Sequence, residues 1–251
     1  MQFSTKETPK PPGPKLILLQ GTYGSGKTAL AMQFPGPGFI DCDGNLDGPE
    51  EFVRKLKPDL EYGYVQVAYK EGAQVDMKEC YNRLMDLIEE FAKEPRIKTI
   101  IIDSLLLVNE FIVLAVLKEE NTRVIDTLHW NAVKSKYNRL LASKLRGTGK
   151  TCIVTVHDKP RYSTEKSDMM KKVIIGYEPN VQSSIRDAFG GLFTDVWCCT
   201  QELEPGNKVS FKLQTVRDGK RDLKNSMGME SVFVAKQGEL MWSKIEKYFK
   251  V

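Results

Sequence analysis

A chain of 251 residues, 41% of them apolar, is long enough to bury a full core, and we expect one domain with a short appendage. Its net charge of +4 is too small to indicate nucleic-acid binding by itself, although it allows a local basic surface. The five cysteines show no C-x-x-C spacing and only two histidines are present, which argues against structural zinc and favours buried thiols in a reducing compartment.

The N-terminus and the hydrophobic segments give no sign of export or membrane insertion. The first residues lack the apolar run of a secretory signal, and the most hydrophobic region, residues 97–117, is interrupted by charged and amide side chains. We therefore expect a soluble, cytoplasmic protein. Four prolines within residues 1–14 predict a flexible proline-rich arm, followed by a single domain over residues 15–251.

Short apolar runs alternate with amphipathic segments along the chain. Continuous apolar runs predict buried strands at residues 15–20, 38–43, 64–69, 98–103 and 151–157. Helical spacing predicts helices at residues 26–34, 77–93, 105–119, 129–146 and 238–249. Residues 158–185 form a long polar segment, and residues 194–203 and 208–216 predict a hairpin. This order predicts an α/β fold: a mostly parallel sheet flanked by helices, with a C-terminal β-hairpin.

The segment "GTYGSGKT" fits the phosphate-binding pattern G-x-x-x-x-G-K-[ST] and stands between a predicted strand and a predicted helix. Its glycines let backbone N–H groups turn inward around a phosphate, and the helix N-terminus adds a positive dipole end. Lys27 would reach the β- and γ-phosphates, and the Thr28 hydroxyl would coordinate Mg²⁺. The predicted nucleotide-binding residues are Gly21, Thr22, Tyr23, Gly24, Ser25, Gly26, Lys27 and Thr28.

The run "TIIIDS" supplies the second half of such a site. Asp103 ends a strand of apolar residues and is placed to hold the magnesium through water. An acid at a strand end can also cap the next helix, but the glycine loop upstream favours the metal. The two motifs together predict that the chain binds ATP with Mg²⁺.

Hydrolysis of ATP also requires a residue that activates water, and Asp103 is followed by Ser104 rather than by an acid. The stretch "FIDCD" offers Asp41 and Asp43 at the end of another strand, where alternate side chains point in opposite directions. One of the two can face the nucleotide, because nucleotide crevices lie beyond the carboxyl ends of the strands.

In order and spacing these motifs resemble the RecA/RadA-like recombination ATPases, specifically the compact phage-encoded branch linked to single-strand annealing (phage AAA-type nucleotide-binding proteins). The resemblance implies a RecA-like P-loop core. "FIDCD" matches the motif whose last acid is the hydrolytic base, which implies that role for Asp43, although Asp is shorter than the usual Glu. "TCIVTVH" is similar to the strand that ends in a γ-phosphate sensor, which implies that His157 acts with Lys27 in catalysis.

Two loops of this family face single-stranded DNA, and the matching segments here are residues 120–128 and 158–185. The second combines cations, which suit phosphates, with tyrosines, which suit base stacking. A solvated surface loop is the alternative interpretation. The residues that the resemblance assigns to DNA binding are Lys159, Arg161, Lys166, Lys171 and Lys172.

The cluster "RDGKRDLKNS" lies where relatives place basic residues that reach the γ-phosphate of the adjacent subunit; a charged turn is the alternative. The residues in question are Arg217, Lys220, Arg221 and Lys224. The resemblance therefore implies ATP sites between subunits and assembly into a ring or filament. It also implies single-stranded DNA and a single-strand-binding protein as partners, in the cytoplasm of an infected bacterial host.

The expected function is ATP-dependent recombination by annealing or strand exchange, with DNA-stimulated ATP hydrolysis. A nucleotide or small-molecule kinase is one alternative, with residues 158–172 as a lid. A kinase lid normally supplies several arginines, and this segment offers only Arg161. The other alternative is a non-catalytic ATP switch, such as a recombination mediator or a helicase-loader-like adaptor.

Overall fold

The computed structural model describes residues 14–70, 73–165, 172–206 and 208–249. The proline-rich arm predicted for residues 1–14 lies outside this description, apart from Pro14. No helix in the described ranges is both long enough and apolar enough to cross a bilayer.

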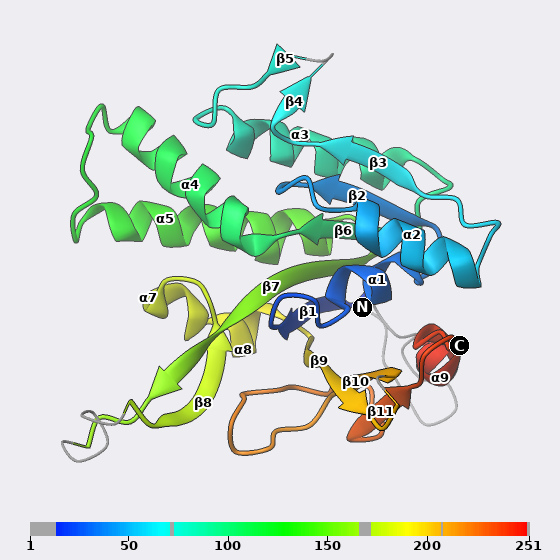
Figure 1. The fold of residues 1–251 in the computed structure, drawn as a ribbon. Coiled ribbons are helices and arrows are strands. Elements are labelled where there is room, and N and C mark those ends of the chain that lie inside the picture. The colour runs from blue at the N-terminus through cyan, green and yellow to red at the C-terminus, as the bar shows by residue number, and fades with distance from the viewer. Residues whose placement is uncertain (1–13, 71–72, 166–171, 207, 250–251) are drawn as a thin grey trace, which may run out of the picture.

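A large sheet forms the centre of the molecule (Figure 1). Its strands are β1 (Leu16–Gly21), β2 (Pro37–Asp41), β3 (Gly63–Gln66), β6 (Thr99–Asp103), β7 (Thr151–Tyr162), β8 (Ile174–Pro179), β9 (Asp195–Glu204), β10 (Lys208–Gln214) and β11 (Val232–Ala235). The order is β11-β10-β9-β1-β7-β6-β2-β3, and β8 pairs with β7. The run from β9 to β3 through β1 is parallel, whereas β8, β10 and β11 are antiparallel to their neighbours. The predicted fold class is therefore confirmed.

Helices cover both faces of this sheet. They are α1 (Lys27–Met32), α2 (Asp47–Leu56), α3 (Cys80–Lys93), α4 (Leu105–Glu119), α5 (His129–Asn138), α7 (Ser183–Arg186), α8 (Phe189–Leu192) and α9 (Trp242–Ile245). A π-helical segment, Arg139–Leu145, continues α5. Leu16 and Leu18 of β1 face the core beneath α3, α4 and α5, whereas Ile17 and Leu19 face the core beneath α1, α2 and α9. Burial on both faces explains why the strands read as continuous apolar runs.

The strand order brings the polar motifs to one edge of the sheet. β1 lies between β7 and β9, and β6 lies between β7 and β2. In the parallel registers Gly21 is level with His157, and Asp41 is level with Asp103. Since parallel strands end at the same edge, the glycine loop and the predicted acids meet there.

The prediction of an irregular segment over residues 158–185 is wrong. β7 continues to Tyr162, and β8 returns antiparallel to it, with Lys159 level with Glu178 and Arg161 level with Gly176. These two strands extend away from the body as an arm (Figure 1). The backbone N–H and C=O groups of this polar segment are satisfied by pairing between β7 and β8, which side-chain polarity does not reveal. We refer to residues 158–162 and 172–179, which include β8, together as the arm.

Three other predictions need correction. The acidic turn after "FIDCD" leads directly into α2, which the sequence analysis missed; its Pro49 lies in the first turn, where the missing N–H is harmless. The predicted strand at 64–69 ends at Gln66, and the chain then forms the small pair β4 (Tyr69–Lys70) and β5 (Ala73–Gln74). The last helix is short, with α9 followed by a 3-10 turn at Glu246–Tyr248.

Candidate active site

The glycine loop has the backbone that a phosphate cradle requires. Gly24 and Gly26 adopt φ angles of 70° and 85°, in the left-handed region that favours glycine. A Cβ on Gly26 would lie only 2.9 Å from the ring of Phe211 on β10, so the loop is also closely packed against β10. The helix α1 starts at Lys27 and directs its N-terminal N–H groups toward the loop.

Lys27 occupies the centre of this loop. Its ammonium donates hydrogen bonds to the carbonyl oxygens of Gly21 (2.9 Å) and Thr22 (2.8 Å), and the residue is only 5% exposed. Burial lowers the pKa of Lys27, while nearby groups including Cys199 and Asp103 act in the opposite direction. An ammonium held by neutral carbonyls can exchange them for phosphate oxygens, which bind it more strongly.

Asp103 and Thr28 come together as the sequence predicts for a magnesium site. The Thr28 hydroxyl donates to Asp103 Oδ2 at 2.6 Å, and the Thr155 hydroxyl of β7 donates to the other oxygen. Burial raises the pKa of Asp103, and these two hydrogen bonds oppose the rise. A carboxylate and a hydroxyl are oxygen ligands of the kind that Mg²⁺ prefers.

The two acids of "FIDCD" lie in different environments. Asp41 is fully buried and accepts hydrogen bonds from the backbone N–H of Asp43 (3.1 Å), the N–H of Gly44 (2.8 Å) and the Tyr64 hydroxyl (3.0 Å). Asp43 is half-buried; burial, and then the neighbouring Asp103 carboxylate, raise its pKa. Asp41 therefore shapes the turn, and Asp43 lies near the Asp103 carboxylate, where hydrogen bonding by Ser104 and Asn45 opposes the rise in its pKa.

His157 lies against the glycine loop. Its ring stacks on Tyr23 with a centroid distance of 3.9 Å, and its Nδ1 lies 3.4 Å from the Lys27 ammonium. Burial, followed by the charge of Lys27, lowers the pKa of His157 to about 4. The imidazole is therefore neutral near pH 7 and can respond to whatever Lys27 binds.

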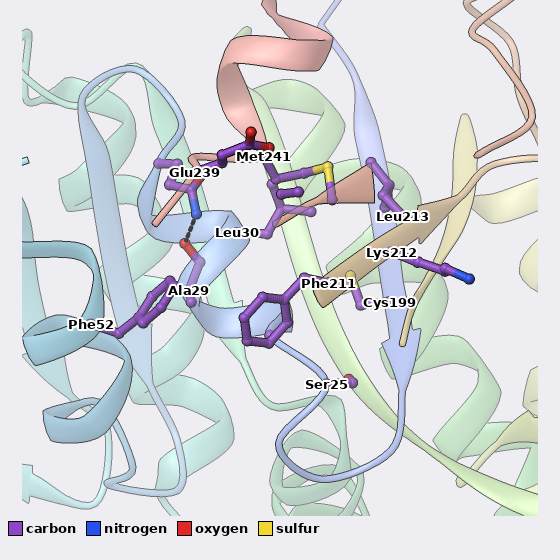
Figure 2. A pocket seen from close by; sticks show the side chains of 13 residues that line it. Ser25, Ala29, Leu30, Phe52, Cys199, Phe211, Lys212, Leu213, Glu239 and Met241 are labelled. Carbon is purple, nitrogen blue, oxygen red and sulfur yellow. Dashed lines mark hydrogen bonds between the residues drawn. The ribbon is translucent and has the colours of Figure 1, made fainter. Parts of the chain in front are cut away.

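A small apolar pocket lies on the other side of α1. Phe52 from α2 and Phe211 from β10 both reach toward α1 here, with ring centroids 5.7 Å apart (Figure 2). The pocket holds about 30 Å³, close to the room for one water molecule and too little for a nucleobase. Phe52 was not predicted because α2 was not predicted. The signal was an aromatic residue three positions after Pro49 in a charged segment.

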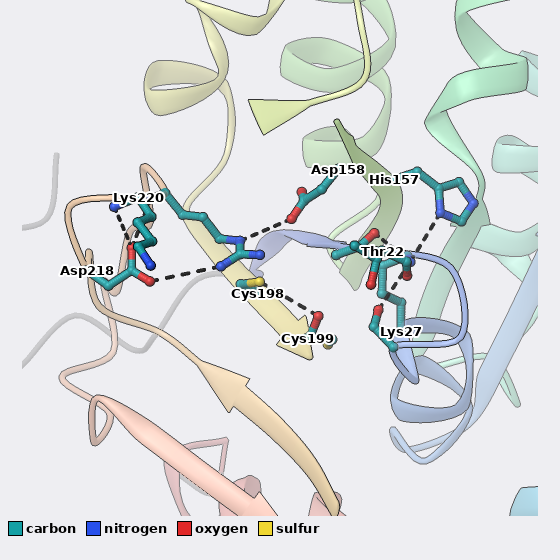
Figure 3. A network of polar contacts seen from close by, with 11 residues as sticks. Thr22, Lys27, His157, Asp158, Cys198, Cys199, Asp218 and Lys220 are labelled. Atoms are coloured by element: carbon teal, nitrogen blue, oxygen red, sulfur yellow. Dashed lines mark hydrogen bonds and ion pairs between the residues drawn. The ribbon is translucent and has the colours of Figure 1, made fainter. Parts of the chain in front are cut away.

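A polar network adjoins the loop and contains Arg221 and Asp158. Arg221 donates from Nε to Asp158 Oδ2 at 3.1 Å, and Asp158 directly follows His157 (Figure 3). The Arg221 guanidinium also lies over the ring of Tyr177, 4.5 Å from its centroid. Arg221 was predicted to act on an adjacent subunit, and that role stays a prediction; within its own chain it contacts Asp158 and Tyr177.

The other predicted trans-acting residues divide into two groups. Lys224 donates to the carbonyl oxygens of Gly190 (2.7 Å) and Phe193 (2.9 Å), so it too is engaged within its own subunit. Arg217 is 67% exposed and pairs with Asp222 at the surface, and Lys220 is exposed. Lys224 is exposed as well, so Arg217, Lys220 and Lys224 are the exposed members of the predicted set.

The residues predicted to bind DNA lie on the arm or next to it. Lys159 is 3.7 Å from Glu178 on the paired strand, and Arg161 is exposed. Lys172 is exposed just before β8. Lys166 and Lys171 lie outside the described residues. Strand β7 connects the glycine loop to Lys159 and Arg161, since its His157 is level with Gly21 and it continues to Tyr162.

A comparison with protein families decides the classification. A family model described as an AAA domain matches residues 14–217, which is most of the chain. The chain belongs to this family. This AAA domain is thus a nucleotide-binding P-loop ATPase, and the match includes the glycine loop, Asp43, Asp103 and His157. The match does not distinguish a phage recombination branch within the family, and no curated protein matches the chain.

Proposed function

We propose that this AAA domain is an ATP-dependent recombination protein that binds single-stranded DNA and promotes annealing or strand exchange. One observation carries the proposal: β7 runs without interruption from His157, beside Lys27, into the arm that bears Lys159 and Arg161. A strand is a stiff element, so a DNA segment on the arm and a nucleotide at the loop would act on one continuous structure.

The residues at the loop fit ATP with Mg²⁺. Positive-φ glycines, a buried ammonium and the N-terminus of α1 suit the phosphates, and the oxygens of Thr28 and Asp103 suit the metal. When bound, Mg²⁺ neutralises charge on the phosphates. Lys27, which donates to the carbonyl oxygens of Gly21 and Thr22, would exchange these partners for phosphate oxygens and orient the phosphates.

Asp43 is the proposed general base. Its raised pKa suits a carboxylate that takes a proton from water, and the Asp41 hydrogen bonds hold the turn that presents it. His157 is the proposed γ-phosphate sensor, because it touches both Lys27 and the loop residue Tyr23. Arg217 and Lys220 are exposed and could reach a nucleotide held by an adjacent subunit of a ring or filament.

The arm has the chemistry that sequence-independent single-strand binding requires. Arg161 and Lys172 are exposed cations for phosphates, and Tyr162, 47% exposed, offers a face for base stacking. Two acids of the arm have cationic partners: Asp158 is buried against Arg221, and Glu178 pairs with Arg186 at 2.6 Å and lies 3.7 Å from Lys159.

ATP turnover with and without single-stranded DNA tests the proposal. We expect DNA to stimulate turnover, and Lys27→Ala to abolish nucleotide binding and turnover together. The matched control is Lys55→Ala, which removes an exposed lysine paired with Glu51 on α2. Turnover indifferent to DNA, together with phosphoryl transfer to a nucleoside monophosphate, would contradict the proposal and indicate a kinase.

A further inference from the structure

Arg221 and Asp158 form an ion pair that is almost removed from solvent. Their side chains are 10% and 0% exposed. Asp158 Oδ1 has no hydrogen-bond partner among the described residues, although it is buried. A buried ion pair with an unsatisfied oxygen is a poor way to stabilise a fold, because desolvation offsets most of the attraction. The pair therefore calls for a functional explanation.

Arg221 and its loop hold β8 of the arm. The guanidinium covers the ring of Tyr177, and the Tyr177 N–H donates to the carbonyl oxygen of Lys220 at 2.9 Å. Gly176 packs so closely that a Cβ there would lie 2.6 Å from the same carbonyl oxygen. Asp218 fixes the loop by accepting from the N–H groups of Lys220 (2.8 Å) and Arg221 (2.9 Å).

The other end of the pair leads to the glycine loop. Asp158 follows His157, whose ring stacks on Tyr23 and whose Nδ1 lies 3.4 Å from the Lys27 ammonium. The His157 carbonyl accepts from the N–H of Asn180, just beyond β8. Two consecutive residues of β7 thus have different partners: His157 contacts Lys27 (Figure 3), and Asp158 pairs with Arg221.

We propose that Arg221 is a positioning residue that couples the nucleotide site to the arm within one subunit. A phosphate that draws Lys27 away from the loop carbonyls also changes the surroundings of His157. Because Arg221 fixes Asp158 and covers Tyr177, β7 and β8 move together rather than independently at this point. The two sites then bias one shared element, which is the physical requirement for coupling. This inference needs nucleotide binding at the loop, but it does not depend on what the arm binds.

Hydrogen exchange of the backbone amides of β8 tests this coupling. The wild-type chain is measured alone, with Mg²⁺-ADP, and with a non-hydrolysable ATP analogue and Mg²⁺. We expect the two nucleotides to give different exchange rates in β8. Arg221→Met should bind both nucleotides within about threefold of wild type and lose at least two thirds of that difference. The matched control is Arg96→Met, since Arg96 is 87% exposed and pairs with Glu94 away from the site.

Two further variants keep the test decisive if Arg221→Met does not fold. Arg221→Lys retains the charge but loses the planar contact with Tyr177, and Tyr177→Leu removes that contact while leaving the ion pair. Each should reduce the response of β8 while nucleotide affinity is kept. A full response in both variants, or a wild-type β8 that does not distinguish the nucleotides, would overturn the proposal. Neither result bears on DNA binding, because no DNA is present.

Discussion

The nucleotide site at the glycine loop, called the pocket from here on, and the arm use charge in opposite ways. In the pocket Lys27 and Asp103 are buried, and each is held by hydrogen bonds to specific partners. On the arm Arg161 and Lys172 are exposed, with no partner within the described residues. Interactions in the pocket are strong because water is excluded, whereas exposed charges are screened and contribute little each. Substitutions in the pocket should therefore have large, specific effects, and those on the arm small, additive ones.

The contrast should be greatest at Asp43. Asp43→Asn keeps the shape of the side chain but cannot take a proton, so we expect steady-state ATP turnover to fall by about 10²- to 10⁴-fold. Nucleotide affinity, measured by titration, should change far less. Asp41→Asn is the matched control: Asp41 accepts three hydrogen bonds in the turn, so this variant should mainly lose stability.

Turnover of Asp43→Asn within threefold of wild type would remove Asp43 from the proposed mechanism. DNA annealing that survives in a variant without turnover would favour a non-catalytic ATP switch. In that case the pocket would act by binding ATP without hydrolysing it, and the pocket and the arm would both be binding sites that differ in ligand affinity.

Gly26→Ala tests how tightly the pocket is packed. Both this variant and Gly24→Ala place a side chain at a positive φ, but only the first adds a methyl group 2.9 Å from Phe211. At Gly24 the nearest atom, Gln201 Nε2, is 3.9 Å away. We expect Gly26→Ala to lose about 1–3 kcal/mol more free energy of unfolding than Gly24→Ala in urea titrations. Equal losses would mean that Phe211 yields easily.

His157 should make the pocket sensitive to acid. Its pKa is about 4 in the folded chain and near 6.5 when unfolded, so the unfolded state binds the proton first. The folded state therefore loses stability as the pH falls from about 6.5 to about 4. We expect His157→Gln to lose less stability over this range than the wild type in denaturant titrations. Identical pH profiles would show that His157 is not held neutral by its surroundings.

Lys172→Ala should give the smallest effect. The loss of one exposed cation from the arm should weaken single-stranded DNA binding a few-fold and reduce the salt slope of the binding constant by about one. Lys55→Ala, on the exposed face of α2, should change neither quantity. An unchanged slope for Lys172→Ala would place DNA elsewhere on the molecule.

Most of the pocket could be predicted because its residues stand in short local motifs. The glycine loop and Asp103 each follow a buried strand, and parallel strands must end at a common edge. The expectation that alternation puts Asp41 and Asp43 on opposite faces is wrong, because residues two apart on a strand share a face. The structure separates the two acids because β2 ends at Asp41 and the chain turns there.

The contacts that the sequence did not indicate all join segments far apart in the chain. Arg221 and Asp158 meet although they are 63 positions apart in the chain, and no local pattern selects this pair over other charged residues. Gly176 and Tyr177 lie in a segment that was expected to be irregular, although "IIGY" is a short strand-forming run that pairs with β7. The family resemblance pointed Arg221 toward a neighbouring subunit, and its burial against Asp158 was not visible in the sequence.

The position of β1 has a consequence for how the chain is made. Both partners of this strand come much later in the sequence, from β7 and from β9. On the ribosome the apolar segment "LILLQG" therefore emerges early and waits unpaired until most of the chain has been translated. The loop that follows β1 therefore gains its neighbouring strands only after β7 and β9 have been made, so we expect nucleotide to bind late in folding rather than to template it.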